Sequence, residues 1–326
     1  MIITIDETSV LERLDKFLVQ KIPGLSRAEV KRQIQAGAVK VNGMPTRKGL
    51  MLRGGDEIEI SARVINRPRE IIPNSEVDFA VLYEDNDLLI VEKPAGIPCH
   101  PLRTEEHWTL ANGLVAKYPD LKGIGFNGLQ PGLLNRIDTM TSGLLLVARN
   151  NEVFTALRTM FKTGEVKKGY QALVHGKVTC QGEIDLFISP HPTRRDRVKV
   201  ISSQEKEKKE FTEARRARTR IRILRYIANY TLLEVLLITG VRHQIRAQLS
   251  YLRHPIVGDS LYGSEACFKT EDLGRYFLHA NYLGFRHPRS GKWTDCHSPL
   301  PPELRAYLDK ISSVEPFFID KEIGKG

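Results

Sequence analysis

Asp138 is the residue whose type and surroundings point most directly to chemistry. It lies in LLNRIDTMTSGLLLVAR, residues 133–149, between two apolar runs and shortly before small hydroxyl residues and Gly143. A carboxylate between buried strands is unfavourable unless a cation pairs with it, so we expect Arg136 or a more distant arginine as its partner. The structural alternative is a turn-capping aspartate, because Asp near Thr and Ser often caps a turn.

Two other motifs resemble well-known sites but lack the required context. Gly123, Gly125 and Gly128 have the spacing of a dinucleotide-binding loop, yet no apolar strand precedes them and Pro131 interrupts any helix after them. Ser142 does not lie in a GxSxG sequence, and neither HExxH nor GxxxxGK occurs. The sequence therefore does not indicate a nucleotide-dependent enzyme, a serine hydrolase or a metalloprotease.

Histidines, a lysine and cysteines are further candidates. His243 and His254 are 11 residues apart without a third ligand nearby, so we interpret both as structural. Lys93, which precedes Pro94 at the end of an apolar run, is expected either to contact phosphate or to position a loop. The cysteines are widely separated, which indicates neither a disulfide framework nor a zinc site. They are Cys99, Cys180, Cys267 and Cys296.

Positive charge is concentrated in two zones of the chain. The 326 residues include 49 basic and 39 acidic ones, a net charge of +10. Residues 194–225 hold 13 basic and 5 acidic residues, and residues 27–48 hold 6 basic and 1 acidic residue. Clustered positive charge attracts polyanions, so the pattern favours nucleic acid as a partner. A solvated charged loop is the alternative for residues 204–220.

Composition and length indicate a globular protein of two domains. Hydrophobic residues make up 41% and charged residues 27% of the chain. No apolar stretch approaches the ~18 residues of a membrane helix, and the start MIITIDETSV lacks the features of a signal peptide. We therefore expect a cytoplasmic protein without membrane contact.

Residues 5–62 are predicted to form a compact helix-helix-strand domain. A capping box beginning at Ser26 indicates a second helix that ends at Gly37, and AVKVNG and GDEIEIS indicate strands. The first helix is indicated by apolar residues at helical spacing, namely Leu11, Leu14, Leu18 and Ile22. Residues 63–77 contain two prolines and no clear period, which predicts a linker.

Residues 78–315 are predicted to form a larger α+β domain with a mixed, mainly antiparallel sheet. VDFAVLYEDNDLLIVEK indicates a hairpin, KKGYQALVHG and TLLEVLLITG indicate strands, and NEVFTALRTMFKTG and RHQIRAQLSYL indicate helices. Strands outnumber helices without regular alternation, which disfavours a doubly wound fold. Residues 316–326 are expected to be a tail.

Several separated segments together resemble the RluA-type family of RNA pseudouridine synthases across nearly the whole chain. LLNRIDTMTSGLLLVA is similar to the family's catalytic motif, which implies Asp138 as the catalytic carboxylate. KKGYQALVHG is similar to a strand whose tyrosine, here Tyr170, stacks on the target base. LLITGVRHQIRAQLSYLRHPIVGDSLYG is similar to the motif whose arginine, here Arg246, pairs with that carboxylate. LIVEKPAGIPCHP and LHANYLGFRHP also match the family.

Residues 5–62 separately resemble the αL RNA-binding motif known from a small-subunit ribosomal protein. The resemblance implies RNA as the partner, with ribosomal RNA favoured and transfer RNA as the alternative, and we expect a monomer. It implies phosphate contacts by the basic residues of this segment, namely Arg27, Lys31, Arg32, Lys40, Arg47 and Lys48.

The chemistry that the resemblance implies needs no cofactor. Uridine becomes its carbon-linked isomer when the bond between base and sugar breaks and the base rejoins through carbon 5, without redox change. Asp138 would act either as nucleophile at the anomeric carbon or as base at the ribose 2′ position, and Arg246 would keep it ionised. A stacked uridine must flip out, and Arg136 is the candidate to fill the gap; a structural ion pair is the alternative role.

The chain departs from the family pattern at Asn135, Thr139 and Val241, where His, Arg and Arg are usual. Thr139 removes a phosphate contact, and Arg242 is the candidate to replace the charge missing at position 241. These departures leave a second reading, in which the protein is a non-catalytic RNA-binding or ribosome-assembly protein on the same fold.

Overall fold

The computed structural model describes residues 1–6, 12–22, 27–61, 70–125, 127–207, 211–263 and 273–313. Its elements before residue 62 are β1 (Ile2–Thr4), β2 (Glu12–Arg13), α1 (Leu14–Lys21), α2 (Arg27–Gln35), β3 (Val39–Val41), β4 (Met44–Pro45), β5 (Met51–Leu52) and β6 (Glu57–Ile60). The elements after residue 69 are β7 (Ala80–Glu84), β8 (Leu88–Lys93), α4 (Leu110–Lys117), η1 (Pro119–Leu121), β9 (Ser142–Ala148), α5 (Asn151–Thr163), β10 (Lys167–His175), β11 (Gly182–Pro190), β12 (Val198–Ile201), α6 (Ser203–Lys206), β13 (Arg215–Ile227), β14 (Tyr230–Leu237), α7 (Gln244–Tyr251), β15 (Leu278–Arg286), β16 (Trp293–His297) and α9 (Pro302–Ser313). A search of the helices in these ranges found none with the length and hydrophobicity of a membrane span.

Two helices pack on a small sheet at the N-terminus. The strand order of that sheet is β1-β6-β3-β4, and β2 pairs separately with β5. Leu14 and Leu18 of α1 share a core with Val30 of α2 and Ile58 of β6, all at most 2% exposed. The apolar periodicity of the sequence reflects this core, and the two predicted helices and the strands near positions 40 and 58 are confirmed.

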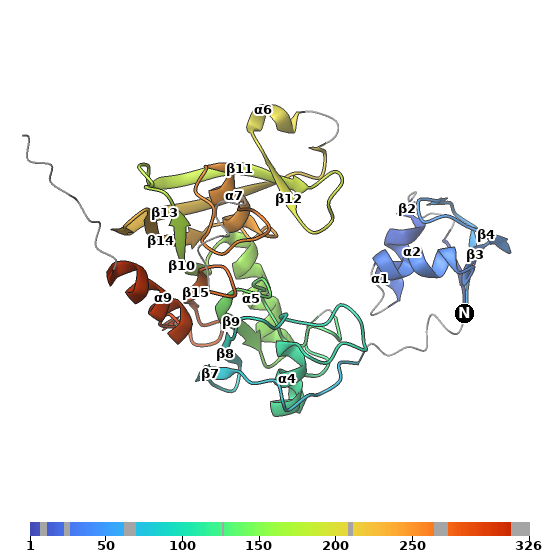
Figure 1. Cartoon of the computed structure of the whole chain (residues 1–326). Coiled ribbons are helices and arrows are strands. Elements are labelled where there is room, and N and C mark those ends of the chain that lie inside the picture. The colour runs from blue at the N-terminus through green and yellow to red at the C-terminus, as the bar shows by residue number, and fades with distance from the viewer. Residues whose placement is uncertain are drawn as a thin grey trace, which may run out of the picture.

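A ten-stranded sheet forms the centre of the larger domain (Figure 1). The strand order is β12-β11-β13-β14-β10-β15-β9-β8-β7, and β16 pairs with β15. All described strand pairs of this sheet are antiparallel except β9 with β15. Helix α5 packs on β9, and α7 packs on β11 and β12. The predicted α+β class with a mainly antiparallel sheet is confirmed.

The parallel contact between β9 and β15 positions the loops that carry the candidate site. Ser142 lies opposite His279, and Gly143 lies opposite Ala280. Gly143 has φ +117°, and a Cβ atom there would lie 2.2 Å from the carbonyl oxygen of Ala280, so only glycine fits. Because the two strands are parallel, the segments that precede them reach the same edge of the sheet. One of these segments carries Asp138.

Residues 71–77 belong to the larger domain rather than to the predicted linker 63–77. Ile71 is 3% exposed in the core of that domain, and the side-chain amide of Asn112 donates to the Ile72 carbonyl at 2.7 Å. Apolar packing and this hydrogen bond hold the segment despite its prolines. Some sequence predictions lie outside the described residues, namely those on Leu11, Ser26, the side chain of Arg27, Cys267 and the tail 316–326.

The charged residues 204–220 include the start of a strand, so the solvated-loop interpretation is wrong for their second half. Strand β13 begins at Arg215, and Ala217, Thr219 and Ile221 are buried along it. The intervening arginines point to the other face, as the alternation of side chains in a strand requires. The alternating pattern RRARTRIR was the sequence signal for this strand.

Candidate active site

Asp138 lies shortly before β9 and pairs with Arg246 of α7. Arg246 Nη1 donates to Asp138 Oδ2 at 2.9 Å. The Arg246 side chain is 8% exposed, whereas that of Asp138 is 27% exposed. The structure therefore brings together two residues 108 positions apart in the chain and leaves part of the carboxylate accessible. Its partner is the distant Arg246 and not Arg136.

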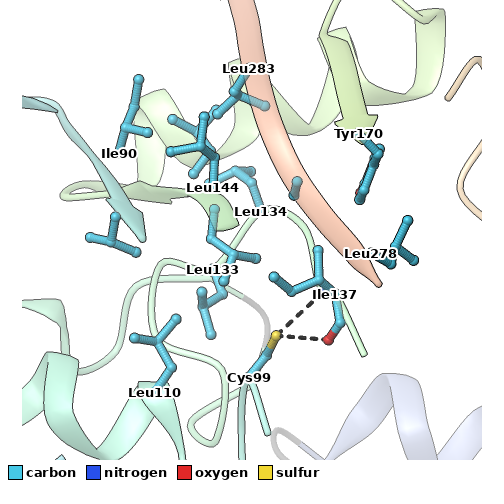
Figure 2. Close-up of a cluster of buried hydrophobic side chains, with 14 of the residues drawn as sticks. Ile90, Cys99, Leu110, Leu133, Leu134, Ile137, Leu144, Tyr170, Leu278 and Leu283 are labelled. Atoms are coloured by element: carbon cyan, nitrogen blue, oxygen red, sulfur yellow. Dashed lines mark hydrogen bonds between the residues drawn. The ribbon is translucent and has the colours of Figure 1, made fainter. Parts of the chain in front are cut away.

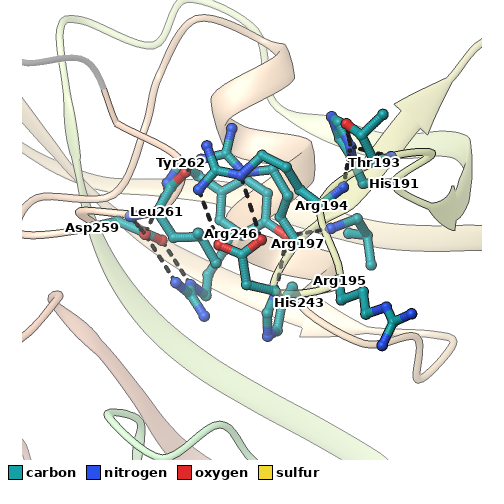
Figure 3. A network of polar contacts seen from close by, with 12 residues as sticks. His191, Thr193, Arg194, Arg195, Arg197, His243, Arg246, Asp259, Leu261 and Tyr262 are labelled. Carbon is teal, nitrogen blue, oxygen red and sulfur yellow. Dashed lines mark hydrogen bonds and ion pairs between the residues drawn. The ribbon is translucent and has the colours of Figure 1, made fainter.

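A second carboxylate fixes the guanidinium of Arg246 from its other side (Figure 3). Arg246 Nε and Nη2 donate to the two oxygens of Asp259 at 2.7 and 2.9 Å, a bidentate geometry. The ring centres of Tyr276 and Tyr262 lie 4.2 and 5.2 Å from Arg246 Cζ. Burial lowers the pKa of Arg246, but the hydrogen bonds to Asp259 and the charges of both carboxylates raise it above its usual value. Arg246 is thus charged and held in one orientation. Sequence reasoning missed Asp259.

Two tyrosines are buried near this ion pair. Tyr170 of β10 is 6% exposed and Tyr276, before β15, is 5% exposed. Burial first, and the charge of Asp138 second, raise the pKa of both phenols. Tyr170 belongs to the same cluster of buried apolar side chains as Leu278 and Ile137 (Figure 2). Tyr170 is therefore a neutral, rigid ring beside the carboxylate.

Asp138, Tyr170 and Arg246 line one cavity of about 1680 Å³. This volume exceeds the ~300–1,000 Å³ of a typical small-molecule pocket. Its cationic lining residues are Arg136, Arg158, Lys162, Lys168, Arg215, Arg242, Arg246 and Arg275. Its carboxylates are Glu106, Asp138 and Asp196. The excess of cations suits a large anionic ligand.

Lys93 positions the loop that carries Asp138. It is fully buried, and Nζ donates to the carbonyl oxygens of Pro94, Ile97 and Thr139 at 2.6, 2.8 and 3.0 Å. Burial lowers its pKa to about 8. Because an ammonium has three hydrogens and all have acceptors here, Lys93 does not bind phosphate. Of the two roles that the sequence allowed, the structure supports loop positioning.

Cys99 and His100 contact the two residues that precede Asp138. Cys99 Sγ donates to the Ile137 carbonyl at 3.1 Å and accepts from the Ile137 amide at 3.3 Å. Arg136 Nη1 contacts His100 Nε2 at 3.2 Å. Burial lowers the pKa of His100, which favours the neutral ring that accepts from Arg136. Sequence reasoning missed both contacts, although it singled out the segment LIVEKPAGIPCHP.

His243 lies in the cavity, which differs from its interpretation as a structural residue. His243 Nε2 is 3.9 Å from Asp138 Oδ1, and Nδ1 is 2.9 Å from Tyr262 Oη. Tyr262 Oη accepts a hydrogen bond from the Val198 amide, so its own hydrogen can be donated to His243 Nδ1. In that tautomer the hydrogen of the His243 ring is on Nε2, which faces Asp138. Burial lowers the pKa of His243, although the charge of Asp138 opposes this effect. His254 instead donates to a main-chain carbonyl at 2.9 Å, a structural contact.

Asn135, which departs from the family pattern, and Arg242, the neighbour of the departing Val241, have defined contacts. Asn135 Oδ1 accepts from the Leu146 amide at 2.9 Å and so orients the loop next to β9. Arg242 lines the cavity, but its guanidinium donates to the carbonyls of Arg195 and Asp196 at 3.0 Å each. Arg242 therefore holds the segment before β12 and, among the described residues, forms no ion pair with Asp138.

The predicted RNA-binding residues of the N-terminal domain that the structure describes are all exposed. They are Lys31, Arg32, Lys40, Arg47 and Lys48. Arg32 is paired with Glu29 one helical turn away, an interaction that solvent weakens. Exposed cations on one small domain are compatible with contacts to a polyanion.

The arginine-rich face of β13 is largely neutralised by neighbouring strands, which reduces the free charge of the zone 194–225. The pairs are Arg216–Asp185, Arg218–Glu183 and Arg222–Glu234. From this zone the described lining of the cavity includes Arg215 and Asp196. The count of basic residues therefore overstated the cations that this zone offers to a ligand.

One cluster in the described part of the chain has the side chains of a metal site. Asp85, Asp87 and His287 lie with ligand atoms within 4.8 Å of one another. Asp87 binds Arg289 at 2.7 Å, and His287 Nε2 lies 3.0 Å from Asp85. An internal ion-pair network accounts for the cluster, and none of its members lines the cavity.

Comparison with known proteins supports one family. The family model described as RNA pseudouridylate synthase matches residues 87–251, and the S4 domain model matches residues 12–58. An uncharacterized RNA pseudouridine synthase of Chloroflexus aurantiacus is 39% identical over 95% of this chain and 93% of its own length.

Two further similarities concern a ribosomal enzyme and a solved structure. Ribosomal large subunit pseudouridine synthase D of Haemophilus ducreyi is 31% identical over 92% of this chain and 91% of its own length. The structure of human RNA pseudouridylate synthase domain containing 1 superimposes with a TM-score of 0.55 at 25% identity, over 72% of this chain and 90% of that one.

Proposed function

The chain belongs to the RNA pseudouridylate synthase family, and on this premise we propose that it isomerises uridines of large-subunit ribosomal RNA with Asp138 as catalytic carboxylate. The observation that carries the proposal is the arrangement Asp138–Arg246–Asp259 beside Tyr170 in one cation-lined cavity. The family membership supports the reaction, and the cavity supports these residues as its site.

The proposed reaction follows from the positions of these groups. A uridine flips out of the RNA and its base stacks on Tyr170. Asp138 then acts as nucleophile at the anomeric carbon or as base at the 2′ position while the base-to-sugar bond breaks. The freed uracil turns and its carbon 5 bonds to the anomeric carbon, which releases Asp138 if it was the nucleophile. Carbon 5 then loses its proton, and N1, no longer bonded to the sugar, gains one. All atoms of the uridine are retained, so the reaction needs no cofactor.

Supporting residues keep the carboxylate in place during this sequence. Arg246 holds the carboxylate of Asp138 in one position through a charge-assisted hydrogen bond. Arg136, held by His100 rather than by a carboxylate, is available to fill the space that the flipped base leaves. His243 Nε2 faces the second oxygen of Asp138 at 3.9 Å.

Ribosomal RNA is the proposed substrate for two reasons. A relative that matches over most of both chains carries the name of a large-subunit ribosomal enzyme. The N-terminal segment matches the S4 domain and presents exposed basic residues. We propose that residues 5–61 form an RNA-binding domain, and that the catalytic domain begins near residue 70 and continues to at least residue 313. Transfer RNA is the alternative substrate.

Mapping of pseudouridines in total RNA tests the proposal. Cells without the protein should lack pseudouridine at specific large-subunit positions, and expression of the wild-type chain should restore them. Asp138→Asn, which keeps the shape of the side chain, should restore none and should retain most RNA affinity. If the wild-type chain binds ribosomal RNA but adds no pseudouridine to any RNA, the non-catalytic reading is correct.

A further inference from the structure

Lys168 is a cationic residue of the cavity that has no role in the proposed reaction. It lies on β10 two residues before Tyr170, so the two side chains point to the same face of the strand. We propose that Lys168 binds a backbone phosphate of the RNA next to the uridine that stacks on Tyr170. This inference rests on the proposed function for the nature of the ligand.

Lys168 lacks an anionic partner within the described ranges. Its Nζ lies 5.8 Å from the ring centre of Phe161, and it forms no ion pair with a described carboxylate. Burial is the sole cause that lowers its pKa, to about 8, whereas a nearby carboxylate would raise it. An ammonium held partly out of water without an anion is unfavourable, and a phosphate oxygen would relieve this.

The other charged groups near Lys168 favour a phosphate as well. Arg158 and Lys162 of α5 line the same cavity, and Arg242 follows the Gly240 turn that borders the ammonium. A methyl group built at Gly240 would lie 3.7 Å from Lys168 Nζ, so the main chain approaches closely at this point. The charged side chains that these segments direct into the cavity are therefore basic, whereas Glu152 of α5 and Glu234 of the neighbouring strand β14 do not line it.

The spacing along β10 matches a single nucleotide. Residues two apart on a strand are separated by about 6.6 Å, since each residue rises ~3.3 Å. This is comparable with the distance from a base to the phosphate of its own nucleotide. A base stacked on Tyr170 thus places a phosphate within reach of the flexible stem of Lys168. A purely packing role, with that stem against Phe161, is the competing explanation.

The proposal makes RNA binding depend on pH in a defined direction. In the free protein Lys168 is charged below its pKa of about 8 and loses its proton above that value. A bound phosphate stabilises the charged form and raises the pKa, so binding takes up a proton at alkaline pH. The affinity for RNA should therefore be constant below pH 7 and fall as the pH rises through 8. At high pH it should approach the affinity of a variant that lacks the charge of Lys168.

Equilibrium binding tests the proposed phosphate contact of Lys168. The ligand is large-subunit ribosomal RNA transcribed in vitro, and binding is measured at several salt concentrations and at pH 7 and 9. Lys168→Met should weaken binding about tenfold at pH 7, and loss of one phosphate contact should make the slope of log affinity against log salt shallower by about 0.7–0.9. Lys168→Arg should bind well at pH 7 and remain unchanged at pH 9. Lys167→Met is the matched control, because Lys167 is exposed on the opposite face of β10; it should behave as wild type.

The inference is wrong if Lys168→Met keeps the affinity, the salt slope and the pH dependence of the wild-type protein. It is also wrong if Lys168→Arg loses affinity at pH 9 as the wild type does, since a packing role would leave the pH dependence to other groups. Thermal unfolding of each variant separates a folding defect from a binding defect. Pseudouridine formation is measured independently: binding differences without isomerisation would leave the phosphate site standing and refute the proposed function.

Discussion

The thiol of Cys99 holds the peptide group of Ile137 by both its carbonyl and its amide. Sγ donates to the carbonyl at 3.1 Å and accepts from the amide at 3.3 Å. Burial raises the pKa of this thiol, so it remains protonated and able to donate. The main chain one residue before Asp138 is thereby fixed in orientation, and with it the direction of the carboxylate.

Replacement of Cys99 should therefore affect turnover more than binding. Cys99→Ala removes both contacts, and we expect kcat to fall about tenfold, because misplacement of a reacting group by ~1 Å can reduce the rate up to a hundredfold. KM should change little. Cys99→Ser can form the same two hydrogen bonds and should lose less. Steady-state kinetics of pseudouridine formation checks this, and equal activity of wild type and Cys99→Ala would contradict it.

The two arginines of α7 and its preceding loop should have different effects. Arg246→Ala leaves both Asp138 and the buried Asp259 without their cation, a change that destabilises a buried pair by about 3–5 kcal/mol. We expect it to be nearly as inactive as Asp138→Asn. Arg242→Ala removes only contacts to main-chain carbonyls and should keep most of the activity. The opposite ranking in single-turnover assays would show that the functional ion pair is misassigned.

Gly143→Ala should destabilise the fold. The added Cβ would lie 2.2 Å from the Ala280 carbonyl oxygen at a φ of +117°, which requires β9 and β15 to separate. We expect a loss of about 3 kcal/mol or more in the free energy of unfolding. Gly291→Ala is the control, because Gly291 also has a positive φ but no atom within 4 Å of an added Cβ, so about 1 kcal/mol is expected. Chemical denaturation of both variants measures the difference, and equal losses would refute the close-contact explanation.

His279 should make the stability of the larger domain depend on pH. It is fully buried between Ser142 and Ser298, and burial lowers its pKa to about 4. In the unfolded chain a histidine takes up a proton near pH 6.5, so acidification from 6.5 to 4 favours unfolding by about 3 kcal/mol. His279→Asn removes this contribution. Its unfolding free energy should therefore fall less steeply with decreasing pH than that of the wild type, and parallel curves would disprove the assignment.

Removal of residues 1–69 should weaken RNA binding without removing the catalytic groups. Among the described residues, the first buried residue of the larger core is Ile71, so the shortened chain retains the described part of that core. We expect weaker binding of long RNA with a shallower salt dependence, because the exposed basic residues of the N-terminal domain are lost. A short uridine-containing stem-loop at high concentration should still be modified. Binding isotherms at several salt concentrations decide, since equal slopes would mean that the N-terminal domain makes no phosphate contacts.

The sequence predicted those helices and strands in which buried apolar residues recur at a regular spacing. The helical spacing of Leu14 and Leu18 and the alternation around Tyr170 reflect burial on one face, which local patterns report directly. Asp138, Tyr170 and Arg246 were named through the family resemblance, and the structure places them around one cavity. Strand β13 was missed because its exposed face is charged.

The residues that support Asp138 could not be predicted in the same way. Their contacts join residues that are far apart in the sequence. Cys99 contacts Ile137, Asp259 contacts Arg246, and His243 faces Asp138. No periodicity marks such contacts, and a cysteine or a histidine taken alone is more often structural. The predicted linker extends too far along the chain because the prolines at 68 and 73 outweighed the short apolar pair Ile71 and Ile72.

The parallel contact of β9 with β15 also determines when the site can exist during synthesis. It joins Ser142 to His279, 137 residues later in the chain, and Tyr276, two residues before β15, stacks on Arg246. Contacts between such distant residues form late, because a long loop must be closed before they contribute any stability. A nascent chain that has not yet extended past β15 has Asp138 but lacks the strand that closes the site around it. The protein should therefore become competent to modify RNA only after β15 has left the ribosome.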